Sequence, residues 1–171
     1  MNELVTFKLP ASFILARALP TGAELAYGFR HGWVTQSDVV AIVKTKCDTG
    51  APLREAEEEL MDLLPIETDR FDQVIAELEI SPEPTERRAR LWLFLVLSAL
   101  LENQSSFEDP LGIIELLYAD FDYPDEIQGL VRFMPPPSGQ PPIGVEGIKA
   151  RWREYVERVG AEYRQRGGSP Q

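Results

Sequence analysis

The longest apolar stretch of this chain, residues 91–101, constrains its fold more than any other feature. Only Ser98 interrupts the stretch, which is about half as long as the roughly 20 residues that a helix needs to cross a bilayer. Arginines precede it, and its apolar positions cover nearly every face of a helix, as expected where other helices surround it. We therefore predict a buried central helix against which the remaining helices pack.

Helical periodicity also dominates the rest of the chain. No segment of the sequence alternates apolar and polar residues for long enough to require a sheet, although Leu4 to Leu9 could form a short strand or an extended arm. Prolines, glycines and capping residues mark where helices begin and end. They predict helices over residues 10–19, 23–31, 37–46, 52–64, 68–80, 85–103, 110–121, 124–133 and 145–166.

These helices define an all-α fold class. A chain of 171 residues is long enough to bury roughly 70% of its unfolded surface in one domain, and too short for two domains to be expected. We predict a single-domain, multi-helix bundle of about eight or nine helices over residues 1–171; its pairs of short helices leave a stack of helical hairpins open. The proline-rich residues 135–142 are expected to form an exposed connector, and residues 167–171 a frayed end.

Several predicted helix ends carry residues suited to capping. Thr35 and Asp38 have the spacing of a capping box, with Asp in place of the usual Glu. Asp109 precedes a proline and is expected to cap the helix that follows, as Thr68 is expected to cap the helix over residues 68–80. Gly32 is expected to end the second helix, because glycine adopts the left-handed conformation without penalty.

The net charge of −11 is unevenly distributed along the chain. Twelve acidic residues lie in residues 55–86 against Arg70 alone, and eight lie in residues 102–126 with no basic residue. Residues 144–171 are mildly basic. Nucleic acid is not expected as a ligand, because phosphate binding needs clustered positive charge that releases counterions.

The sequence also indicates a compartment. The chain begins without the basic and apolar segments of a secretory signal, and no stretch is long enough to span a membrane. Cys47 is the only cysteine, so no intrachain disulfide can form and a reducing environment fits best. We expect a cytoplasmic protein that does not bind membranes; the oligomeric state is left open.

No catalytic, cofactor or metal site is predicted. The sequence contains no G-x-G-x-x-G, P-loop or G-x-S-x-G pattern, and His31 is its only histidine, which removes every two-histidine metal site. His31 could serve as the base for a nucleophile only through tertiary proximity. Its place at a helix C-terminus favours a structural role, in which the imidazole caps backbone carbonyls.

An acidic and aromatic segment, residues 118–126, is the strongest candidate for a metal site in the sequence. Its four carboxylates suggest a calcium or magnesium loop, but an EF-hand loop starting at Asp120 would place Pro124, Asp125 and Val131 at its fifth, sixth and twelfth positions, where they do not fit. We favour a second interpretation, in which Asp122, Asp125 and Glu126 cap the helix over residues 124–133.

Three stretches resemble a known family. They are Phe7-Lys8-Leu9-Pro10-Ala11-Ser12-Phe13, Phe29-Arg30-His31-Gly32-Trp33, and Tyr118-Ala119-Asp120-Phe121-Asp122-Tyr123-Pro124 leading to Arg132-Phe133-Met134-Pro135. Together they resemble the bacterial domain of unknown function 2247 over about Thr6 to Pro135, with the connector and last helix outside the match. The resemblance implies a small bacterial cytoplasmic protein and supplies no catalytic residues.

Small, acidic bacterial proteins without an active site are similar in character to the immunity proteins that neutralise toxins. We therefore expect a non-catalytic binding protein, an immunity-type inhibitor that occludes a basic toxin domain such as a nuclease. The expected partner-binding residues form two groups: Asp120, Asp122, Tyr123, Asp125 and Glu126, and the helix face with Glu57, Glu58 and Asp62. Two alternatives stay open: a metal-assisted or carboxylate-based hydrolase that uses the first group, and a structural oligomerisation module.

Overall fold

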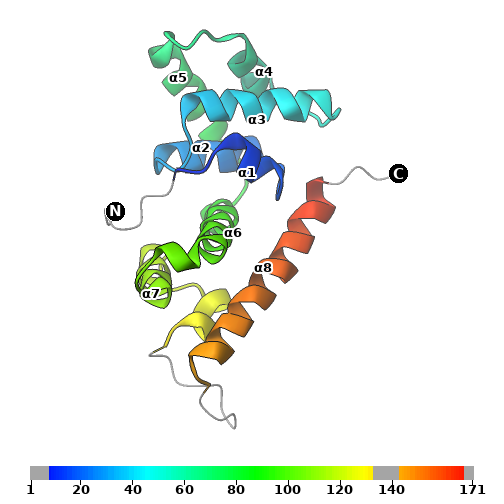
Figure 1. The fold of residues 1–171 in the computed structure, drawn as a ribbon. Coiled ribbons are helices and arrows are strands. Elements are labelled where there is room, and N and C mark those ends of the chain that lie inside the picture. The colour runs from blue at the N-terminus through cyan, green and yellow to red at the C-terminus, as the bar shows by residue number, and fades with distance from the viewer. Residues whose placement is uncertain (1–7, 133–142, 168–171) are drawn as a thin grey trace. The chain divides into compact units, whose positions relative to one another are not determined.

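The structure, a computed structural model, describes residues 8–132 and 143–167 (Figure 1). Within these residues the chain forms α-helices and short 3-10 helices and no strand, which confirms the all-α, multi-helix fold class. The elements are α1 (Ala11–Leu15), α2 (Gly22–Arg30), α3 (Gln36–Asp48), α4 (Glu55–Asp62), α5 (Thr68–Glu79), α6 (Thr85–Glu102), η2 (Gln104–Ser106), α7 (Pro110–Asp120), η3 (Asp125–Leu130) and α8 (Val145–Gly167). The connector over residues 135–142, most of the proposed N-terminal arm and residues 168–171 lie outside the described residues.

The described residues divide into two compact units. The N-terminal unit contains residues 8–92 and 163–167, and the C-terminal unit contains residues 93–132 and 143–162, so that α6 and α8 each contribute to both. The prediction that the whole chain is one domain stays a prediction.

In the N-terminal unit, α2 packs on α3 and α5, α3 on α1 and α4, and α4 on α5 (Figure 1). The spacing of apolar residues along α5 explains its orientation, because Phe71, Val74, Ile75 and Leu78 fall on one helical face and are all fully buried. The opposite face is polar and exposed. An amphipathic sequence thus gives α5 one buried side and leaves its acidic side on the surface.

A column of aromatic rings occupies the core of this unit. His31 stacks between Tyr27 and Trp33, with ring centroids 4.1 and 5.0 Å away, and Trp33 stacks on Trp92 at 5.8 Å. The His31 Nδ1 lies 2.8 Å from the Tyr27 carbonyl oxygen, to which the ring nitrogen donates. The structural role expected of His31 at a helix C-terminus is therefore confirmed, and Gly32 follows it with the predicted positive φ of 78°.

The end of α8 is joined to α2 by a buried acid. Glu24 is fully buried, and its carboxylate accepts hydrogen bonds from the Thr21 backbone N–H and from both terminal nitrogens of Arg166. Burying a carboxylate is costly unless it is paired and hydrogen-bonded, and both conditions are met here. Glu24 and Arg166, which are far apart in the sequence, thereby hold the end of α8 against α2 in the N-terminal unit.

In the C-terminal unit, the second half of α6 is accompanied by α7, η3 and the first part of α8. The fully buried Trp152 of α8 donates its indole N–H to the Leu97 carbonyl oxygen of α6 at 3.2 Å. Asp109 caps α7 as predicted, since its side chain accepts the Gly112 N–H and a proline occupies the first helical turn.

Several expectations about helix ends are wrong, among them that of the first helix, which is α1 and ends at Leu15 and not at residue 19. The helix over residues 124–133 is the 3-10 helix η3, and no side chain caps it, because Pro124 occupies the capping position. Thr68 is the first residue of α5, and Glu67 holds its cap position. The helix expected from Pro52 begins only at Glu55.

The late start of α4 coincides with long-range contacts of Arg54. Its guanidinium donates to the Leu78, Glu77 and Ile80 carbonyl oxygens at the C-terminus of α5. The last carbonyls of a helix have no partner within the helix, and a cation there also interacts favourably with the negative end of the helix dipole. This contact between distant segments accompanies the non-helical backbone of Arg54, and the local sequence pattern gives no sign of it.

Candidate functional site

The two groups of residues expected to bind a partner lie in different units. Glu57, Glu58 and Asp62 belong to α4 of the N-terminal unit, whereas Asp120 to Glu126 lie between α7 and η3 of the C-terminal unit.

Glu57 does not lie on the exposed face of α4, and this expectation is wrong. Its side chain is 3% exposed, and the Lys46 ammonium donates to its Oε2 at 2.5 Å. The other oxygen, Oε1, accepts the Arg54 backbone N–H at 3.2 Å. The apolar positions of α3 and α4 bring Lys46 and Glu57 together inside the unit, where each is the other's compensating charge.

Part of the acidic excess in residues 55–86 is neutralised by bases on the surface. Arg70 donates through two nitrogens to the carboxylate of Glu59, and this hydrogen bonding lowers the pKa of Glu59 below its ordinary value. Arg30, from a different part of the sequence, pairs with Glu79 at 3.0 Å and with Asp72 at 4.0 Å. The charge imbalance read along the sequence is thus partly compensated in space.

The exposed acids that remain surround the connection between α4 and α5. Asp62 ends α4, Glu67 precedes α5 and Asp69 lies in its first turn, and all three are exposed. Across the described part of the chain no ion pair is seen for Glu58 or for these three acids. They therefore present negative charge to the solvent.

Two large apolar side chains lie between these acids. Leu64 is 61% exposed and Ile66 is 84% exposed. The helix predicted over residues 52–64 ends at Asp62, so Leu64 lies outside it and the expected end of this helix is wrong. The signal that could have revealed it is Pro65, because the residue before a proline avoids the helical conformation. We call Glu58, Asp62, Leu64, Ile66, Glu67 and Asp69 the α4–α5 surface.

A groove adjoins this connection. It has a volume of about 330 Å³ and lies between α3 and the end of α4. Val40 and Ala41 of α3 and Leu63 and Pro65 of the connection give it apolar walls, with polar lining residues around them. The Gln36 side chain donates to the Pro65 carbonyl oxygen at 3.4 Å, which ties the connection to α3. No functional role for this groove could be read from the sequence.

The second surface is the acidic turn after α7, which the sequence singled out. Asp120, Asp122 and Asp125 are exposed, and Tyr123 is 59% exposed with its ring edge-on to Tyr118 at 5.2 Å. Asp122 and Tyr123 have φ values of 60° and 56°, and the Tyr123 N–H donates to the Tyr118 carbonyl oxygen at 2.8 Å. The left-handed pair reverses the chain at the end of α7 and projects Tyr123 outward.

Basic residues compensate part of this second acidic zone as well. Arg132 donates to both Asp109 and Glu115, and the hydrogen bonds from Arg132, followed by that from the Gly112 N–H, lower the pKa of Asp109. Arg158 of α8 lies 3.7 Å from the carboxylate of Glu126. Glu126 is therefore part of an ion pair, and Asp120, Asp122 and Asp125 supply the exposed charge.

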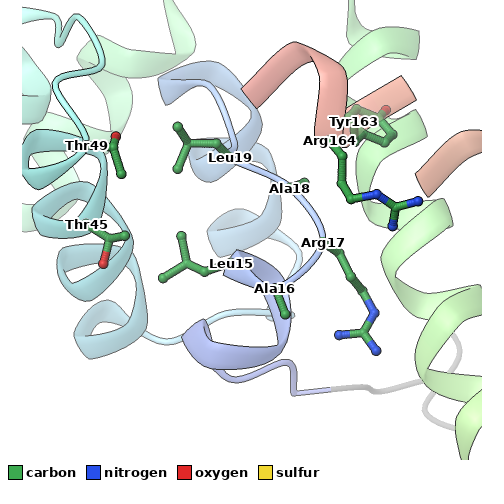
Figure 2. A pocket seen from close by; sticks show the side chains of 9 residues that line it. All are labelled: Leu15, Ala16, Arg17, Ala18, Leu19, Thr45, Thr49, Tyr163 and Arg164. Carbon is green, nitrogen blue, oxygen red and sulfur yellow. The ribbon is translucent and has the colours of Figure 1, made fainter. Parts of the chain in front are cut away.

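A further hollow lies in the N-terminal unit between the segment after α1, the end of α3 and the end of α8 (Figure 2). Figure 2 shows Leu15 and Leu19 on the side of α3 that carries Thr45 and Thr49. The hollow has a volume of about 250 Å³. Both threonine hydroxyls donate to backbone carbonyls of their own helix, those of Ala41 and Lys46. The described residues lining this hollow include no carboxylate, histidine or cysteine, and burial raises the pKa of the lining Tyr163 to about 12, so this phenol retains its proton near neutral pH.

Two further properties of residues 8–132 and 143–167 bear on other functions. No three histidine, cysteine, aspartate or glutamate side chains there are placed to hold a metal ion together. Likewise, none of the helices in this part of the chain combines the length and the apolar character that crossing a membrane demands.

Comparison with known proteins places the chain in a family. The model of the bacterial family DUF2247, described as "uncharacterized protein conserved in bacteria", matches residues 11–160. The match confirms the resemblance seen in the sequence and extends it, because it includes the connector and most of α8. No curated protein and no solved structure gave a significant match.

Proposed function

We propose that this chain, which belongs to the DUF2247 family, acts by binding. Its surface exposes acidic side chains around two large apolar ones. It is an immunity-type inhibitor that covers a basic toxin domain, for example that of a nuclease. The observation that carries the proposal is the α4–α5 surface, where Leu64 and Ile66 are exposed beside Asp62, Glu67 and Asp69, acids for which no ion pair is seen within the described part of the chain. The Glu67 carboxylate accepts the Leu64 backbone N–H at 2.6 Å, which holds this acid beside Leu64.

The charge of this surface suits an encounter with a basic protein. Exposed charges that are not neutralised attract an oppositely charged partner over about a Debye length, roughly 8 Å at physiological salt. Such attraction raises association rate constants toward about 10⁸ M⁻¹s⁻¹ at low ionic strength. The α4–α5 surface would thus speed the capture of a basic domain.

The apolar side chains of this surface contribute binding energy and slow dissociation, which charge alone does not provide. Large exposed apolar groups rimmed by polar residues are characteristic of interaction sites, because burying them against a partner removes their surface from water. Contacts buried in this way slow dissociation and carry most of the binding energy at protein interfaces. Leu64 and Ile66 therefore serve as anchors within an acidic rim.

The turn after α7 is a second candidate contact. It combines exposed acids with the exposed Tyr123, and tyrosine is among the residues that most often dominate interface energetics. We assign the first contact to the α4–α5 surface, because it exposes two large apolar side chains beside its acids, whereas the turn exposes Tyr123.

The product of the adjoining gene in the native genome is the partner to test. We expect it to be basic, to form a stable complex with this chain on size exclusion, and to lose its activity when the chain is present in equal amount. Retention of full activity at saturating concentrations of the chain, with the two proteins eluting separately, would contradict the proposal.

A further inference from the structure

We propose that the groove between α3 and the α4–α5 connection receives an aliphatic side chain from a basic segment of a partner protein. The inference rests on the proposed function and deepens it, because it names the chemistry of the segment that binds. The occupant has lysine or arginine residues on one side and a leucine-like side chain on the other.

The size and lining of the groove define the apolar part of this occupant. At about 330 Å³ it lies at the small end of the range in which whole ligands are held, so one large side chain fits it better than a cofactor does. Its walls of Val40, Ala41, Leu63 and Pro65 supply no carboxylate that could take part in chemistry. The groove is therefore suited to anchoring, and Leu64 and Ile66 extend its apolar surface along the chain.

Charge complementarity defines the basic part. Asp62 directly precedes Leu63 of the groove wall, and Glu67 and Asp69 follow Pro65 closely in the sequence. All three are exposed and negatively charged at neutral pH. A segment that entered the groove would pass these acids, and lysine or arginine residues there would gain attraction where acidic residues would be repelled.

Lys44 provides an internal test of whether the occupant of the groove is positively charged. It is the basic residue among those lining the groove, and it is exposed. If the occupant is basic, Lys44 opposes binding, and Lys44→Glu should strengthen it. If the occupant were acidic, the same substitution should weaken binding. A purely structural role for Lys44 predicts no change in affinity.

The experiment titrates the full-length chain into two fluorescein-labelled peptides and follows anisotropy. The first peptide is lysine-rich with two leucines one helical turn apart, and the second has alanine in place of both leucines. We expect the leucine peptide to bind about tenfold more tightly, as burial of several methylene groups requires. Lys44→Glu should tighten binding of the leucine peptide by about two- to fivefold at low salt.

Four further variants separate the two kinds of contact. Leu64→Ser/Ile66→Ser should remove most of the preference for leucine, whereas Ile80→Ser, which changes an equally exposed apolar residue outside the surface, should retain it. Asp62→Asn/Asp69→Asn should weaken both peptides, whereas Glu108→Gln/Glu154→Gln removes the same amount of exposed charge elsewhere and should have less effect. Circular dichroism checks that each variant is folded.

The outcomes distinguish failure of the groove proposal from failure of the proposed function. If charge variants weaken binding but the leucine and alanine peptides bind equally, the groove proposal is wrong and the proposed function stands. If neither peptide binds the native chain, the groove proposal fails, and the proposed function is decided separately by inhibition and co-elution of the product of the adjoining gene. If the chain sediments as a dimer that Leu64→Ser/Ile66→Ser dissociates, a second copy covers this surface and the partner proposal is overturned.

Discussion

The Lys46 ammonium donates to the Glu57 carboxylate at 2.5 Å, and both side chains are more than 90% buried. Glu58, the next residue in the sequence, is exposed, so neighbouring acids of one run have opposite roles. One carboxylate is part of the core of the N-terminal unit, and the next belongs to its surface.

Removing one member of this pair should be strongly destabilising. Glu57→Gln leaves the ammonium of Lys46 buried without its counter-charge, and we expect a loss of about 3 kcal/mol in the free energy of unfolding measured with urea. Glu58→Gln is the matched control and should change it by less than about 0.5 kcal/mol. The double variant Lys46→Met/Glu57→Met should recover much of the loss, and a double variant as unstable as Glu57→Gln would contradict this explanation.

A glycine in α2 is required by the aromatic core. A Cβ atom at Gly28 would collide with the indole ring of Trp92, whose Nε1 donates to the Glu24 carbonyl oxygen at 2.7 Å and is thereby fixed. We expect Gly28→Ala to reduce the free energy of unfolding by about 2 kcal/mol, although alanine favours helices, because overpacking outweighs propensity. Thermal unfolding monitored by tryptophan fluorescence would measure it, and an unchanged or higher Tm would count against the described packing.

The alkaline stability of the chain should depend on Tyr163. Burial, with the charge of Glu24 adding to it, raises the pKa of Tyr163 to about 12, whereas an unfolded tyrosine ionises near pH 10. The folded state therefore retains the proton longer, and the stabilisation is present below pH 10 and is lost as the pH rises to about 12. Urea unfolding at several alkaline pH values should show a loss on the order of 2 kcal/mol that Tyr163→Phe lacks. Equal losses in the two proteins would contradict the assignment.

The acid stability should depend on Asp109. Its pKa is lowered first by the hydrogen bonds from Arg132, so the folded state binds the proton less readily than the unfolded state does. The stabilisation is present above about pH 4 and is lost as the pH falls through the lowered pKa. Asp109→Asn should therefore flatten the decline in urea midpoint between about pH 5 and pH 3. Arg132→Gln should flatten it in the same direction, and an unchanged decline in both variants would argue against the pair.

The sequence indicated most helices correctly because their signals are local. The apolar spacing of α5 and the caps formed by Thr35 and Asp109 depend on residues within a few positions of one another, and the structure has them as expected. The late start of α4 accompanies contacts of Arg54 with the end of α5, which join segments more than 20 residues apart. No local pattern carries such information.

The candidate site was harder to predict for a related reason. Whether an acid in a charge run is buried depends on which base lies opposite, and Glu57 is buried because Lys46 meets it from another helix. Exposure of Leu64 likewise depends on where α4 ends. Composition identified acidic zones correctly, but the choice among their members required the positions of residues distant in sequence.

The central claim is that the charge of the α4–α5 surface is displayed for a basic protein. The most direct test is the association rate constant with the basic product of the adjoining gene, measured by stopped flow at low and at physiological salt. Asp62→Asn/Asp69→Asn should slow association about fivefold at low salt and less at physiological salt, whereas Glu108→Gln/Glu154→Gln should slow it less than twofold, an estimate that rests on local steering by charge. Equal rate constants for the native chain and Asp62→Asn/Asp69→Asn at both salt concentrations would contradict the account.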